Sequence, residues 1–280
     1  MVFGDEAAAA RPLMQINYYR LRAYWLPFED AAPAPGEHAF KPGTRFEDVI
    51  GFYEFDRRLR LLVMGAVERV EVSVRARWAH VMALAYGAHG YLVADHFSDP
   101  IIHAECLDKL NEEIRRSKET FVKHYKAKYT NPQLPPLWAV CEVMSLGHLS
   151  RWVGNLKFRK DRREIASTYQ VDPDILESFL HHLTVLRNTC AHHSRLWNRR
   201  FGLRMKVPKH PNWLAACFGT DPGMLYNTLV MLAHMQSVIA NDSMWAAEIV
   251  ALLDEFPQAK PKAMGFPDNW RTLPLWSDAT

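Results

Sequence analysis

The segment from Leu186 to Asn198 holds the residues of this chain that are best suited to chemistry. It reads LRNTCAHHSRLWN and contains cations, imidazoles and amides, namely Arg187, Asn188, His192, His193, Arg195 and Asn198. No Asp or Glu occurs between Ser178 and Thr220. A cluster of cations and imidazoles without an internal counter-charge is costly to fold unless an anion completes it. The sequence therefore indicates a phosphate-bearing partner.

The types and spacing of Arg187, Asn188 and His192 fit the cleavage of RNA by its own 2′-hydroxyl. A histidine whose pKa lies near neutrality can accept or donate a proton at physiological pH. An arginine can stabilise the negative charge that develops on the phosphorane oxygens. We therefore expect these three as catalytic residues of an endoribonuclease. We expect no metal site and no cofactor, because HExxH and CxxC motifs are missing and no acidic ligand lies in the window.

An arginine followed five positions later by a histidine is a weak motif, since the chain contains two such pairs. The other pair is Arg75 and His80, and there Glu71 lies one turn before the arginine and can pair with it. We expect Arg75 to be structural. Arg187 has no such acidic neighbour in the sequence. We expect its guanidinium to lie half-buried at the edge of the core, either paired with Glu142 or waiting for an anionic ligand.

A helix that begins after Asp172 is expected to carry the cluster. Asp172 is a suitable N-cap with Pro173 in the first turn, and an apolar stripe follows it to Leu186. If the helix continues, offsets of three and four place one polar stripe on it, comprising His181, Thr184, Asn188, His192 and Arg195, with Arg199 at its end. Cys190 falls on the inner stripe, where a small thiol packs inertly. The surface expected to contact RNA comprises His193, Arg195, Asn198, Arg199, Arg200, Arg204 and Lys206.

The remaining sequence also predicts helices. Thr44 and Glu47 form a capping-box pattern, and apolar residues recur at helical spacing from there to Tyr86. This pattern predicts one very long helix, or two helices joined by a kink near Gly65. A second helical region is predicted over 99–129, and a buried helix carrying Glu142 over 137–146.

The two ends of the chain are expected to elaborate a central helical body. A short helix is predicted within NYYRLRAYWLPF, and the Pro- and Gly-rich residues 31–43 form a loop. Strand patterns are almost absent, which predicts an all-α fold. We divide the chain into 1–43, a helical bundle over 44–254, and a Pro- and Trp-rich tail over 255–280 that packs on the bundle.

Composition limits the class of protein. The chain has 280 residues, 49% hydrophobic and 23% charged, with a net charge of +3, which is too small to indicate nucleic-acid binding by itself. The four cysteines are widely separated, as in a reducing compartment, and no signal peptide precedes them, so we expect a cytoplasmic protein. Residues 222–241 are uncharged, but polar residues such as Asn227 and His234 interrupt them. They fit a buried helix, and we expect no membrane contact.

Several segments together resemble the Abi-like family of bacterial abortive-infection proteins, the AbiD and AbiF group, and through it the HEPN superfamily of helical ribonucleases. The segments are NYYRLRAYWLPF, FYEFDRRLRLLV, VERVEVSVRARW, PPLWAVCEVMSLGHLSRW, LRNTCAHHSRLWNRRF and MGFPDNWRTLPLW. They extend over nearly the whole chain and are far more specific than the spacing of one arginine and one histidine.

The resemblance implies a HEPN-like bundle whose active site contains an arginine, a following polar residue and a histidine, which match Arg187, Asn188 and His192. It implies metal-independent RNA cleavage at a composite site formed by two such units. Because this chain has one clear motif, we expect a homodimer. Similar proteins act in phage defence or as toxins, and some are associated with small noncoding RNAs.

Two alternatives to an endoribonuclease remain open from the sequence. The first is an RNA-binding module controlled by a small RNA, without intrinsic cleavage, in which the basic residues after His193 contact phosphates. In the second, Arg187 is paired with Glu142 and the histidines form a structural contact between two copies.

Overall fold

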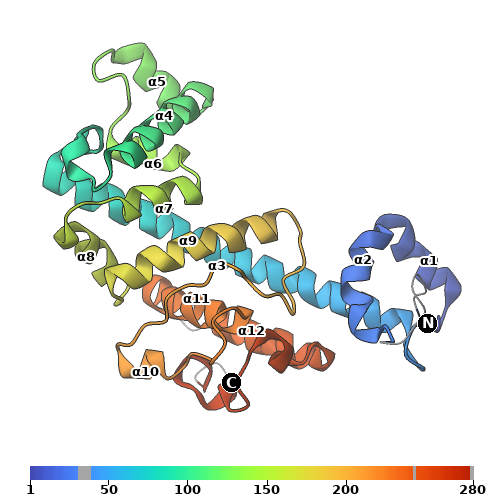
Figure 1. Ribbon diagram of the computed structural model, residues 1–280. Helices are drawn as coiled ribbons and strands as arrows, with labels where there is room; N and C mark the ends of the chain where they lie inside the picture. The colour runs from blue at the N-terminus through green and yellow to red at the C-terminus, as the bar shows by residue number, and fades with distance from the viewer. Residues whose placement is uncertain (31–38, 242–243, 278–280) are drawn as a thin grey trace.

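A single helix of 41 residues, α3 (Phe46–Tyr86), forms the axis of the computed structural model, which describes residues 1–30, 39–241 and 244–277 (Figure 1). It passes through Gly65 without interruption, so the first of the two predicted alternatives, one very long helix, is confirmed. The predicted capping box of Thr44 and Glu47 is wrong by one residue. The N-cap is Arg45, whose N–H donates to the Asp48 carboxylate at 3.4 Å, whereas the Thr44 hydroxyl donates to the Lys41 carbonyl.

The bundle is built by helices that pack on α3. They are α6 (Leu137–Val143), α8 (Arg159–Ser167), α9 (Pro173–Ala191), α11 (Leu225–Ala240) and α12 (Met244–Glu255). Helix α7 (Leu146–Gly154) packs on α9. The two helices approach closely at Gly147, where an added Cβ atom would lie only 3.0 Å from Cγ2 of Thr184. The described residues contain isolated bridges but no strand, so the all-α prediction is confirmed.

Two predicted helices are divided in the structure. The segment 99–129 forms α4 (Pro100–Arg116) and α5 (Thr120–Lys128), which lie at one end of the molecule (Figure 1). The helix predicted over 137–146 ends at Val143, since Met144 is extended and the Ser145 hydroxyl accepts the His148 N–H at 3.3 Å to cap α7. Because Ser145 is the N-cap of α7, its backbone is extended and cannot continue α6.

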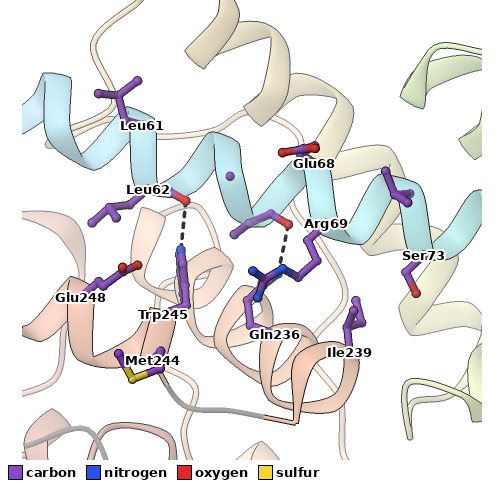
Figure 2. A pocket seen from close by; sticks show the side chains of 13 residues that line it. Leu61, Leu62, Glu68, Arg69, Ser73, Gln236, Ile239, Met244, Trp245 and Glu248 are labelled. Carbon is purple, nitrogen blue, oxygen red and sulfur yellow. Dashed lines mark hydrogen bonds between the residues drawn. The ribbon is translucent and has the colours of Figure 1, made fainter.

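Helix α11 is buried from Leu225 to Gln236, which explains its uncharged sequence. Its polar side chains are paired inside the protein: Asn227 accepts the Gly219 N–H, and Gln236 donates to the Ala66 carbonyl of α3. Figure 2 shows this bond beside the one from the Trp245 indole of α12 to the Leu62 carbonyl. The prediction of a buried helix is confirmed, and among the described residues no helix has the length and apolar character needed to cross a bilayer.

The two ends of the chain pack on this body. Helices α1 (Glu6–Gln15) and α2 (Tyr18–Trp25) lie at the N-terminal end of α3 (Figure 1). Helix α2 is the short helix predicted within NYYRLRAYWLPF. The predicted loop lies largely in 31–38, outside the described residues. After α10 (Asn212–Ala215) and α12, the tail runs through short 3-10 turns to α13 (Pro274–Ser277). Its buried Trp276 donates to the Tyr226 hydroxyl of α11 at 3.2 Å, which attaches the end of the tail to the bundle.

We predict that acid destabilises the fold, because two histidines, His182 and His234, are buried. His182 lies between the Leu203 carbonyl and the Thr228 hydroxyl, at 2.8 Å from each, and His234 donates to the Tyr169 carbonyl. Burial lowers the pKa of both below 6.5, so under acid conditions the unfolded chain binds protons that the folded chain does not. The free energy of unfolding should therefore fall as pH falls below about 6.5, by up to about 1.4 kcal/mol per pH unit for each histidine.

Urea unfolding at pH 7, 6 and 5 measures this dependence. A His182→Gln variant should show a smaller slope, because the glutamine has no titrating group. An unfolding free energy that is equal at pH 7 and pH 5 would contradict the prediction.

Candidate functional site

The C-terminus of α9 carries the predicted catalytic residues. The helix ends at Ala191 because His193 adopts a left-handed conformation with φ 56°. The His193 N–H donates to the Cys190 carbonyl and the Ser194 N–H to the Thr189 carbonyl, both at 2.9 Å, which is a Schellman ending. The predicted polar stripe is therefore only partly correct. His181, Thr184 and Asn188 lie on the helix and His192 caps it, whereas Arg195 and Arg199 lie beyond it.

A buried carboxylate from α3 holds the chain that follows this turn. Oδ1 of Asp56 accepts the backbone N–H groups of Leu196 at 2.8 Å and Trp197 at 2.5 Å. Its Oδ2 accepts the Tyr24 hydroxyl at 2.6 Å and the Arg60 guanidinium. Asp56 is 0% exposed and Arg60 5%. One side chain thus joins α2, α3 and the segment after α9.

The protonation states of this network follow from its donors. Burial raises the pKa of Asp56, whereas Arg60 and the other donors around the carboxylate lower it. Four donors converge on the two oxygens and leave no site for a proton, so we assign Asp56 as ionised. Burial and the adjacent carboxylate raise the pKa of Tyr24, which keeps its hydroxyl as a donor.

Helix α2 adds two bonds to the same segment. The Arg20 guanidinium donates to the His193 carbonyl at 2.5 Å, and the Arg195 guanidinium donates to the Ala23 carbonyl at 2.9 Å. Arg195 is therefore partly occupied by a structural contact. Together with Asp56, these bonds fix the backbone on which His192 and His193 lie.

The side chains of Arg187, Asn188, His192 and His193 are all exposed. The prediction that Arg187 is half-buried is wrong, and so is the first of its two alternatives, a pairing with Glu142. Nη1 of Arg187 lies 3.4 Å from Oδ1 of Asn188, and among the described residues no carboxylate lies within 4 Å of it, whereas Glu142 lies 3.9 Å from Arg75.

The predicted RNA-binding residues beyond the turn differ in their surroundings. Arg200 forms two bonds to Asp221, of 2.7 and 3.2 Å, so the charge of this one arginine is balanced by the residue that follows the acid-free window. Arg199 donates to the Arg195 carbonyl and lies over the ring of Phe201. Asn198, Arg204 and Lys206 are exposed. The structure thus places Asn198, Arg204 and Lys206 in solvent and holds Arg195, Arg199 and Arg200 by protein contacts.

Other residues considered for chemistry have structural contacts. Arg75 bonds to Glu71 and donates to the Met144 carbonyl at 2.6 Å, so its predicted structural role is confirmed. Burial raises the pKa of the Cys190 thiol to about 12, which makes it a poor nucleophile, as predicted. Within the described residues, no three His, Cys, Asp or Glu side chains gather in a way that could hold a metal ion.

Two cavities of the bundle are not lined by Arg187, Asn188 or His192. The groove in Figure 2, of about 660 Å³, lies between α3, α11 and α12, and none of the predicted catalytic residues lines it. A smaller pocket of about 370 Å³ between α4, α7 and α9 includes His181 and Thr184. The candidate site is therefore an exposed surface at the end of α9.

Sequence reasoning missed the residues that hold this surface, namely Arg20, Tyr24, Asp56 and Arg60. A pattern for two of them is present in the sequence. Asp56 and Arg60 occupy positions between Phe52, Leu59 and Val63 on the apolar face of the long helix, where a charged pair four residues apart indicates a buried network.

Comparison with known proteins gives one family. The family model described as Abi-like protein matches residues 11–198, which include α2, α3, α9 and the turn after it. No curated protein and no solved structure matches the chain.

Proposed function

The chain belongs to the Abi-like protein family, and from this premise we propose that it is a metal-independent endoribonuclease that acts in abortive infection. Membership of the family implies a role in abortive infection, a form of bacterial defence against phage. The ribonuclease activity, its HEPN-like site and its catalytic residues are our proposal.

One observation supports the proposal above others. Arg187 and His192 are exposed at a helix end whose following segment is bonded to α2 and α3, and among the described residues neither forms an ion pair with a carboxylate. A cation and an imidazole that are held in place without a protein counter-charge are prepared to receive an anion. A phosphodiester supplies that charge.

The proposed reaction uses the 2′-hydroxyl of the RNA. A histidine removes its proton, the 2′-oxygen bonds to phosphorus, and the bond from phosphorus to the 5′-oxygen breaks. A second histidine gives a proton to the departing 5′-oxygen. Arg187 stabilises the charge on the phosphorane, and Asn188 orients the Arg187 guanidinium through their contact at 3.4 Å. Two copies of the chain, each supplying His192, provide both histidines in a composite site.

Product analysis tests this reaction. The full chain is incubated in EDTA with the RNA that co-purifies with it and with synthetic single strands, and the ends are sequenced. We expect 2′,3′-cyclic phosphate and 5′-hydroxyl ends, and none with a His192→Ala variant. Cleavage that requires a divalent metal, or that leaves 5′-phosphate ends, would contradict the proposal.

The exposure of Arg204 and Lys206 favours a second candidate, an RNA-binding module that a small noncoding RNA controls. Phosphate contacts alone predict an affinity that falls steeply with salt. If the protein is such a module, RNA binds but is not cleaved. The His192→Ala variant then keeps the wild-type affinity, whereas the double variant Arg204→Ala with Lys206→Ala binds RNA more weakly. Arg200 is unsuitable for this test because it is bonded to Asp221.

A further inference from the structure

Helix α2, which is bonded to the turn after α9, presents two exposed aromatic side chains, Tyr18 and Tyr19. Tyr19 is 76% exposed and Tyr18 52%. A large aromatic ring in solvent is unusual for a side chain that serves only packing, and it offers a flat face to a planar ligand.

Helix α2 contacts the turn that carries His193 through the residues that follow Tyr19. Arg20 bonds to the His193 carbonyl, and the Ala23 carbonyl accepts a bond from Arg195. Residues 20 and 23 are three apart, so one face of α2 lies against the turn after α9. Tyr19 precedes Arg20 and lies one turn before Ala23, which places it at the edge of that face.

The Tyr19 ring is held in place by a chain of aromatic contacts that begins at a buried tryptophan. Trp25, which is buried, contacts Tyr18 edge to face with ring centroids 4.9 Å apart. Tyr18 in turn contacts Tyr19 edge to face at 5.6 Å, and the Asn17 side chain caps the helix by accepting the Tyr19 N–H at 2.9 Å. A ring held in this way loses little conformational entropy when a ligand stacks on it.

We infer that Tyr19 stacks on an unpaired base of the RNA, next to the phosphate bound by Arg187 and His192, and that the substrate is single-stranded at that position. This inference rests on the proposed function. In a duplex the bases are stacked on each other and their faces are covered, whereas an unpaired base can lie on an aromatic ring. Arg20 adds a positive charge beside the ring, which suits the adjoining phosphate.

Binding of a non-cleavable RNA to the full chain tests the inference. The probe is a fluorescein-labelled single strand of mixed sequence with 2′-O-methyl groups, whose 2′-oxygens cannot attack phosphorus. The same strand annealed to its complement serves as the duplex probe. Dissociation constants are measured by fluorescence anisotropy for Tyr19→Phe, Tyr19→Leu and Tyr19→Ala. The control is Tyr129→Ala, at an exposed tyrosine that follows α5, far from α2 (Figure 1).

We expect Tyr19→Ala and Tyr19→Leu to weaken single-strand binding about 5- to 100-fold, because a stacked base contributes that much on an aromatic ring. Tyr19→Phe and Tyr129→Ala should bind as the wild type does, and all variants should keep its circular dichroism. The inference is overturned if Tyr19→Leu binds single strands like the wild type, or if it weakens single-strand and duplex binding equally; the proposed function survives either result. A wild-type chain that neither binds nor cleaves any RNA overturns both.

Discussion

Replacing His192 by alanine is expected to lower the rate of RNA cleavage about 10²- to 10⁴-fold, the usual contribution of a positioned acid or base. The effect falls on the rate and not on binding, because Arg187 and the other exposed cations still contact phosphates. The fold should be unaffected, since the His192 side chain is exposed and only its backbone takes part in the end of α9. Single-turnover cleavage in EDTA, at saturating enzyme, measures the chemical step directly.

The matched control for this variant is His181→Ala. His181 is an exposed histidine of the same helix, and it borders a separate pocket between α4, α7 and α9. Its loss should leave the cleavage rate unchanged. A His192→Ala chain that cleaves at the wild-type rate would exclude His192 as the acid or base and would shift the weight to the RNA-binding alternative.

Replacing Asp56 by asparagine is expected to lower the free energy of unfolding by about 3–5 kcal/mol, the range for breaking a buried ion pair by removing one partner. The asparagine amide would bring N–H groups toward Leu196, Trp197 and Arg60, whose own donors now converge on the carboxylate. Arg60, 5% exposed, would keep its charge with no counter-charge. Urea unfolding followed by circular dichroism measures the change.

The matched control for this variant is Glu54→Gln, another loss of a carboxylate charge on α3. Glu54 pairs with Arg57 at 2.7 Å on the surface, and an exposed pair of this kind contributes about 0–1 kcal/mol. Tyr24→Phe, which removes one donor from the network, should cost about 1 kcal/mol and remains measurable if the asparagine variant does not fold. Equal stabilities of the Asp56 and Glu54 variants would show that the network does not hold the segment after α9.

These two predictions concern one arrangement. The turn that carries His192 and His193 has no acidic residue of its own, and it is positioned by a carboxylate that lies about 140 residues earlier in the chain. Loss of Asp56 should therefore also lower cleavage under conditions where the variant is still folded, whereas loss of His192 should leave the fold intact.

The sequence by itself determined the fold class, the long helix α3, the start of α9 at Asp172 and the structural role of Arg75. These features depend on interactions between residues a few positions apart, such as apolar periodicity, the cap at Asp172 and the pairing of Arg75 with Glu71. Local spacing records such interactions directly.

Only the tertiary structure decided where α9 ends, that Arg187 is exposed, and that Arg200 is paired with Asp221. The helix ends at Ala191 and does not continue beyond Arg195, because Asp56, Arg20 and the Ala23 carbonyl bind the chain that follows it. Those groups belong to α2 and α3, more than a hundred residues away, and helical periodicity within 172–199 contains no information about them. A buried carboxylate that accepts distant backbone N–H groups outweighs the small free-energy differences of helix propensity, and so it determines the path of the chain.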